Sequence, residues 1–221
     1  NVMRYNYAGI TRVNYIFENQ DNIDFDGKEE ILAQAAFLRA YYYFELVKFF
    51  GDVPLITDRR LGIDEVSTIS RSPASEVYGQ IEDDLLYASD ILDWTAAQKG
   101  RVTKGAALSL LGKAYLYQEK FSEAATVLDQ VITEGPYSTI DFATSDEYRS
   151  MFSVANEGNT ESVFEVEYSG DEGGGYGCFV CLEGNAAVGF HGIRQYNGPV
   201  YSDGNSYNLP TEDLYNAFEA N

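Results

Sequence analysis

The sequence is poor in the residues that build metal centres and nucleic-acid interfaces. Its 221 residues include two cysteines, one histidine and one tryptophan. A structural zinc site takes four cysteine or histidine ligands, so the composition leaves little room for one. Only 15 basic residues stand against 35 acidic ones, which gives a net charge of −20. A surface of that sign repels phosphate backbones and anionic lipid headgroups, so nucleic-acid binding is not expected.

Long apolar runs are scarce as well. The sequence has no uninterrupted apolar stretch of bilayer-spanning length, no initiating methionine and no signal peptide. It opens within a helical pattern (Val2, Ile10, Val13, Phe17) and closes within another (Thr211 to Phe218). We therefore expect it to be the interior of a longer protein. The hydrophobic content of 45% is ample for a core.

The most apolar part of the chain is residues 28–50, with the run Tyr41-Tyr42-Tyr43-Phe44 at its centre. Successive residues of a helix point about 100° apart, so this run faces several sides at once. A helix that is apolar most of the way round is a buried one. We predict a central helix capped by Asp26, with Glu29 as the return half of a capping box. Gly51 is expected in the left-handed position that ends it, before Pro54.

Two further helices are predicted around it. Residues 2–20 carry one apolar stripe that includes Asn14, for which a helix-to-helix hydrogen bond is the simplest role. Ser72 and Pro73 open a helix that runs to about Leu92. Its apolar face is Val77, Ile81, Leu85 and Ala88, and we expect Glu82, Asp83 and Asp84 to form a solvated edge. The polar segment 57–72 between the helices is predicted to be a surface loop.

The acidic turn at residues 20–27 resembles the start of a calcium loop. Asn22, Asp24 and Asp26 are spaced as in such a loop and Gly27 follows. The position that should supply a bidentate glutamate is Ala33, so the ligand set is incomplete. Helix capping explains Asp26 better than a metal does.

Residues 103–136 carry the spacing of a helical hairpin repeat. Small and apolar residues fall at the offsets of one tetratricopeptide repeat: Gly112, Tyr115, Phe121, Ala124, Leu128, Val131 and Pro136. Glu119 stands where a small turn residue is usual. One repeat cannot bury its face alone, so we expect residues 28–50 and 73–92 to stack on it.

After Pro136 the pattern changes. A short helix over about 146–152, capped by Ser145, is followed by alternation from Ser162 to Tyr168 that predicts a half-buried strand. Residues 169–208 are rich in glycine and aromatics and show no helical period. Such a long irregular stretch is usually functional. A helix capped by Thr211 then restarts.

The catalytic candidates are weak. Cys178 and Cys181 form a C-x-x-C pair, but no helix follows and His191 is the only other obvious metal ligand. The glycine-rich run 170–177 lacks the lysine of a phosphate loop. A carboxylate pair for glycoside hydrolysis is defined only by its separation in space, so hydrolysis stays a minority hypothesis. We predict no catalytic residue, no metal and no cofactor.

The aromatic side chains of the irregular stretch are the better candidates for function. Aromatic faces stack on sugar rings, while polar side chains bond to hydroxyl groups. In a peptide binder the same residues would hold side chains and main chain. The candidate ligand-binding residues are Tyr176, Phe190, Arg194, Tyr196 and Tyr201.

The segment from Ala33 to Leu55, AQAAFLRAYYYFELVKFFGDVPL, resembles the signature helix of the SusD/RagB family. Similar matches occur at Arg71 to Ala88, at the repeat, at the passage ending in Val166 and at Asn208 to Glu219. The resemblance implies a mainly α fold of stacked tetratricopeptide-like hairpins, with a loop-rich part containing short strands. It implies one domain over 1–221, with a helical core at 1–160, loops at 161–208 and a further helix from 209.

The resemblance also implies a function. SusD-like proteins are non-enzymatic lipoproteins on the outer-membrane surface of Bacteroidetes. They cap a SusC-type TonB-dependent β-barrel and deliver oligosaccharides, or in some members peptides, for import. The lipid-bearing cysteine would lie outside this chain, and the sequence does not decide between glycan and peptide. The alternative is a soluble tetratricopeptide-type scaffold that binds a protein partner.

Overall fold

The computed structural model describes residues 2–22, 24–62, 64–166, 194–199, 204–207, 209 and 211–217. The chain divides into two compact units, Asn1–Glu165 and Val166–Asn221, which we treat separately. The described part is mainly helical, which confirms the predicted fold class. Within it no helix is long and apolar enough to cross a bilayer. The organisation as one domain stays a prediction.

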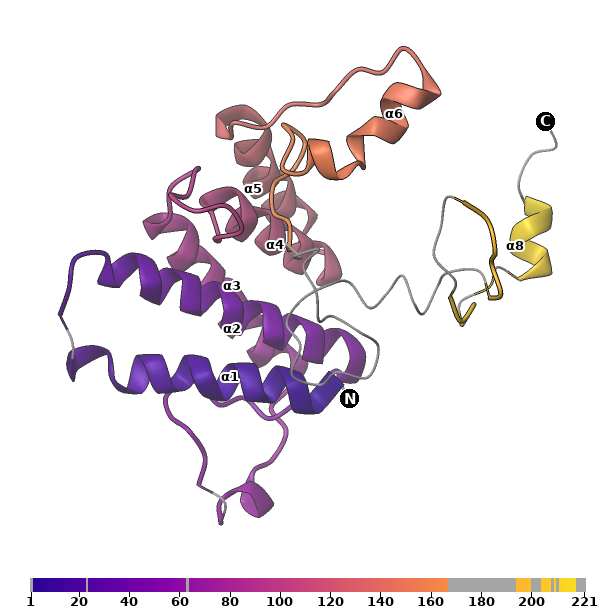
Figure 1. The fold of residues 1–221 in the computed structure, drawn as a ribbon. Coiled ribbons are helices and arrows are strands. Elements are labelled where there is room, and N and C mark those ends of the chain that lie inside the picture. Colours follow the sequence, from indigo (N-terminus) through magenta and orange to yellow (C-terminus); the bar gives the residue numbers. More distant parts are fainter. Residues whose placement is uncertain are drawn as a thin grey trace. The chain divides into compact units, whose positions relative to one another are not determined.

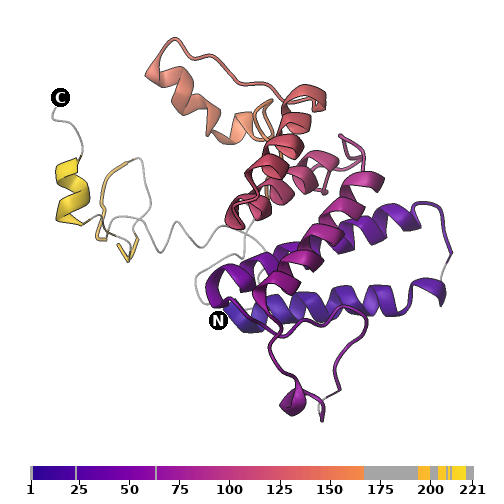
Figure 2. The same cartoon turned by 180° about the vertical axis from the view of Figure 1, so that it is seen from behind.

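In the first unit, the helices of residues 2–134 form a row in which each packs on the next (Figures 1 and 2). Helix α1 (Val2–Glu18) and the 3-10 turn η1 (Gln20–Asn22) lead into α2 (Lys28–Phe50). A projecting segment with the 3-10 turn η2 (Val66–Thr68) leads to α3 (Ala74–Ile91). Helices α4 (Lys104–Tyr117) and α5 (Phe121–Glu134) follow, then α6 (Ser145–Met151) and η3 (Val154–Asn156).

Helix α2 is buried on several sides, as its all-round apolar sequence predicted. It packs against α1 on one side and α3 on another. Tyr43, Phe44 and Leu46 are at most 1% exposed although they point in different directions from the axis. Burying a large apolar side chain contributes about 1.5–3 kcal/mol, so this helix supplies much of the core.

Helix α2 begins and ends at the predicted residues, but its caps differ from the predicted ones. The N-cap is Gly27 rather than Asp26, with φ of 88°, so the expected capping box with Glu29 is not formed. A positive φ is open to glycine without strain, which explains why the chain turns there. At the other end Gly51 has a positive φ of 64° but a ψ of −117°, which lies outside the predicted left-handed helical region, and its N–H bonds to Val47 O.

Helix α3 corrects two expectations. Ser72 does not cap it: Pro73 occupies the N-cap, and the carboxylate of Asp52 accepts a hydrogen bond of 2.8 Å from the N–H of Ala74. Ser72 instead pairs with Val53 in an antiparallel β-bridge. Asp84 is not on a solvated edge, because it is 4% exposed and bonds to Arg39 of α2.

The tetratricopeptide-like hairpin at 103–136 is confirmed as α4 and α5. Thr103 caps α4 by accepting from the N–H of Ala106. A Cβ added to Gly112 would lie 2.6 Å from Leu128 Cδ2, so glycine is what lets the two helices approach. Glu119, in the turn between them, takes a positive φ of 60°.

The chain beyond the hairpin departs from two predictions. Helix α6 is capped by Thr144 rather than Ser145, in a reciprocal capping box with Glu147. The strand expected over 162–168 is not formed by residues 162–166, and 167–168 lie outside the described residues. The ring of Phe164 packs edge-on against Phe37 instead.

In the second unit, α8 (Glu212–Ala217) begins directly after Thr211, as predicted.

Candidate ligand-binding site

Of the five predicted ligand-binding residues, Arg194 and Tyr196 belong to the described part. They lie in the turn 194–199. Arg194 Nε and Nη2 donate to Asn205 O at 3.2 and 2.8 Å, and its N–H donates to Ser206 Oγ at 2.8 Å. Arg194 therefore ties this turn to residues 205–206. Tyr176, Phe190 and Tyr201 lie outside the described residues, as do Cys178, Cys181 and His191.

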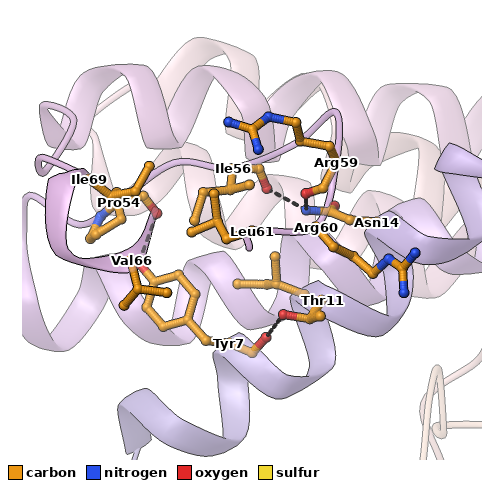
Figure 3. A pocket seen from close by; sticks show the side chains of 11 residues that line it. Tyr7, Thr11, Asn14, Pro54, Ile56, Arg59, Arg60, Leu61, Val66 and Ile69 are labelled. Carbon is orange, nitrogen blue, oxygen red and sulfur yellow. Dashed lines mark hydrogen bonds between the residues drawn. The ribbon is translucent and has the colours of Figure 1, made fainter. Parts of the chain in front are cut away.

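The first unit contains a cavity of about 390 Å³ that sequence analysis did not identify (Figure 3). It lies between α1 and the segment that follows α2. Side chains of α1 form one wall and those of residues 54–69 the other. The lining residues are Tyr7, Ile10, Thr11, Asn14, Pro54, Ile56, Arg59, Arg60, Leu61, Val66 and Ile69.

Helix α1 positions its wall through helical spacing. Tyr7, Ile10 and Asn14 are three and four residues apart, so they share one face. The Tyr7 hydroxyl donates to Pro54 O at 2.8 Å. Asn14 Nδ2 donates to Ile56 O at 2.8 Å and to Arg59 O at 3.1 Å. The predicted helix-to-helix role of Asn14 is thus mostly a helix-to-loop role, with Arg39 of α2 at 3.5 Å as its helical partner.

Side chains of helix α2 also bond to the segment 54–59. The Tyr43 hydroxyl donates to Ile56 O at 2.8 Å and accepts from Ile56 N at 2.7 Å. Arg39 Nη1 donates to Thr57 O at 2.6 Å. The backbone from 54 to 59 therefore satisfies four of its carbonyls with side chains from two helices, which holds the cavity wall in place.

The titration of these groups follows from their burial. Burial raises the pKa of Tyr43 to about 12 and raises the pKa of Tyr7 further still. Burial also raises the pKa of the Asp84 carboxyl, while hydrogen bonds from Arg39 and Gln80 oppose that rise. Both tyrosines are consequently neutral donors at physiological pH.

The cavity rim is charged but internally paired. Arg59 bonds to Glu65 at 2.8 Å, and Arg60 bonds to Glu18 at 2.8 Å. Arg60 also lies over the ring of Tyr15, 4.4 Å from its centroid. With its tyrosine and asparagine groups engaged by backbone carbonyls, the interior presents mainly aliphatic surface. Such a cavity suits an apolar group better than a hydroxyl-rich one. The spacing of Tyr7, Thr11 and Asn14 was the only sequence signal for it.

The comparisons with known proteins agree with this fold. Residues 1–116 match a SusD-like family model described as starch-binding, associating with the outer membrane. The chain belongs to the SusD-like family.

Its relatives are longer proteins. A SusD-like protein of Formosa agariphila is 30% identical over 219 residues, which is 97% of this chain and 42% of that one. A solved laminarin-binding SusD-like protein is 36% identical with a TM-score of 0.82, covering 96% of this chain and 48% of that one. A SusD-like protein of Bacteroides fragilis is 33% identical with a TM-score of 0.71, covering 77% and 34%. This SusD-like chain thus spans less than half the length of each.

Proposed function

We propose that this SusD-like protein binds a glycan at the bacterial cell surface and delivers it to a SusC-type TonB-dependent transporter. The observation that carries the proposal is the similarity to a laminarin-binding SusD-like protein over 96% of the chain. Laminarin is therefore the first glycan to test, with peptides as the other cargo class. The transporter, an outer-membrane location and a lipid anchor beyond this chain are parts of the same proposal.

We assign ligand contact to Tyr176, Phe190, Arg194, Tyr196 and Tyr201, carried by one domain over 1–221. The support from the described part is local. Arg194 makes three hydrogen bonds to residues 205 and 206. These bonds pre-order the turn that carries Tyr196, and an ordered aromatic side chain loses less entropy when a sugar ring stacks on it.

We propose binding without hydrolysis. A glycosidase needs two carboxyl groups on either side of a bound sugar, one of them with a raised pKa. Asp84 has a raised pKa, but its carboxylate is buried and bonded to Arg39 through both oxygens. Its surroundings favour a structural role.

The test uses the whole chain in native gels that contain laminarin. Retardation of wild type, with loss of retardation in Tyr196→Ala, is the expected result. Tyr5→Ala serves as the matched control, because it removes a tyrosine from a different part of the surface, where Tyr5 is 61% exposed. Release of reducing sugar by the wild-type protein would overturn the non-catalytic assignment.

The transporter requires a separate experiment. Purification of the native protein from detergent-solubilised outer membranes should bring down a β-barrel protein in stoichiometric amount. Recovery of the protein alone from the soluble fraction would contradict delivery to a transporter and favour a soluble scaffold.

A further inference from the structure

A second cavity lies in the first unit, at the beginning of α2. It encloses about 270 Å³ between the turn that precedes α2 and residues 97–101, which precede α4. Its walls come from segments about 70 residues apart in the chain, which packing of the helices brings together. Gly27 shapes one wall, because its φ of 88° strains any other L-residue.

Planar polar groups line this cavity in a connected row. Gln34 Nε2 donates to Glu30 Oε1 at 3.1 Å, and Arg101 Nη1 donates to Gln34 Oε1 at 3.2 Å. Arg101 Nε donates to Gln98 Oε1 at 3.2 Å. Gln34 is only 8% exposed, so the row is anchored in the helical core. A carboxylate, two amides and a guanidinium thus stand in fixed relation to one another.

This row has hydrogen-bonding capacity to spare. A guanidinium has five N–H groups, of which these bonds use two, and a carboxylate accepts at both oxygens. Gln98 and Asp26 also line the cavity, and they bring an amide and a carboxylate to it. Neighbouring hydroxyls of a sugar ring each need a donor and an acceptor, and alternating planar groups supply both.

An exposed aromatic ring completes the set. Phe25 lines the same cavity and is 46% exposed, which is a costly position for a phenyl ring in water. Aromatic faces stack on the apolar face of a sugar ring. Asp26 and Glu30 make the cavity acidic, so an anionic sugar would be repelled. The described residues contain no group of three or more acidic, histidine or cysteine side chains that could hold a metal ion.

We propose that the cavity bounded by Phe25, Glu30, Gln34 and Arg101 is a second sugar-binding site, for a neutral sugar residue of a glycan. The inference rests on the proposed function and adds a site on the helical unit. A polysaccharide chain that is held at more than one site gains avidity from each further contact.

The test compares variants of the whole chain in native gels that contain laminarin, starch, mixed-linkage β-glucan or mannan. Phe25→Ala and Arg101→Ala should each weaken binding of the retarding polysaccharide about tenfold, as expected for loss of a stacking ring or a charged hydrogen bond. Phe121→Ala changes a phenylalanine that is 64% exposed on α5 and should bind as wild type. Thermal melts of all variants check that they fold.

A second readout locates the contact. Trp94 is the only tryptophan and lies in the same segment as Ala97, so its fluorescence should change on binding of the retarding polysaccharide in wild type and should change less in Phe25→Ala. Wild-type binding that Phe25→Ala and Arg101→Ala leave unchanged would overturn this site alone. If wild type binds none of the four polysaccharides, the proposed function fails and the site fails with it.

Discussion

Arg39 of α2 and Asp84 of α3 form a two-pronged ion pair inside the helical unit. Arg39 Nε lies 2.8 Å from Asp84 Oδ2, and Nη2 lies 2.6 Å from Oδ1. Their side chains are 9% and 6% exposed. Gln80 donates to the same carboxylate at 2.9 Å, and the ring of Phe17 lies 4.6 Å from the guanidinium. One pair therefore joins α1, α2 and α3.

Breaking this pair from one side should be strongly destabilising. Asp84→Leu or Arg39→Met leaves a buried charge without its partner, which costs roughly 3–5 kcal/mol. The double variant removes both charges and should be markedly more stable than either single one. Urea unfolding at pH 7 measures all three. Arg60→Met, which breaks an exposed pair with Glu18, should cost about 0–1 kcal/mol. Additive losses in the double variant would contradict the coupling.

Tyr43 should make the protein sensitive to alkali. Its pKa is about 12 in the folded chain against 10.0 for an ordinary tyrosine, because burial disfavours the phenolate. The unfolded state therefore loses its proton first. The stabilisation is complete below pH 10 and declines as the pH rises towards 12, by about 1.4 kcal/mol per pH unit.

Urea unfolding between pH 9 and 11 tests this. Tyr43→Phe lacks the hydroxyl, so its stability should start lower and fall less steeply than that of wild type. Tyr5→Phe, at an exposed position, should keep the wild-type slope. Identical slopes in wild type and Tyr43→Phe would refute the assignment.

The cap on α3 comes from a residue 22 positions earlier. Asp52→Ala should destabilise the protein by about 1 kcal/mol, since the N–H of Ala74 loses its acceptor. Asp52→Asn keeps a side-chain oxygen and should lose less. Asp58→Ala, an exposed aspartate in the same connection, is the control. Equal melting temperatures for Asp52→Ala and wild type would show that water replaces the cap.

The close approach of α4 and α5 predicts a rescue. Gly112→Ala places a methyl group against Leu128 and should cost about 1–3 kcal/mol. Adding Leu128→Ala makes room, so the double variant should lose less than the sum of the single losses. Denaturant titration of the three variants measures the coupling. Strict additivity would mean that the helices separate instead.

The helices followed from sequence because their periodicity is local. The all-round apolar segment at 28–50 and the repeat spacing from Gly112 to Pro136 both reappear as helices within two residues of their predicted ends. The apolar periodicity of a helix depends on which of its faces is buried. It does not depend on which neighbouring helix covers that face.

The errors concern interactions between distant segments. Asp84 follows two other acids, Glu82 and Asp83, which suggested solvent exposure, yet it is three residues from Ile81 and seven from Val77 on the buried face. Asp84 lies on the apolar face of α3, and Arg39 lies on a helix that is apolar on all sides. Two opposite charges at such positions indicate a buried ion pair. The cap from Asp52 and the second cavity left no local pattern, and for the first cavity only the spacing along α1 did, since each needs segments that only the fold brings together.

The side-chain bonds to the carbonyls of Pro54, Ile56, Thr57 and Arg59, with the bridge between Val53 and Ser72, fasten both ends of the segment that projects from the helices. Between those points the segment contacts α1 at the cavity wall and through the pair of Arg60 with Glu18, so the residues outside these contacts are the ones that can change in length and sequence. In engineering terms this is a graft site. Foreign loops, affinity tags or fluorescent probes inserted near Gly62 would be displayed on a base that does not depend on them.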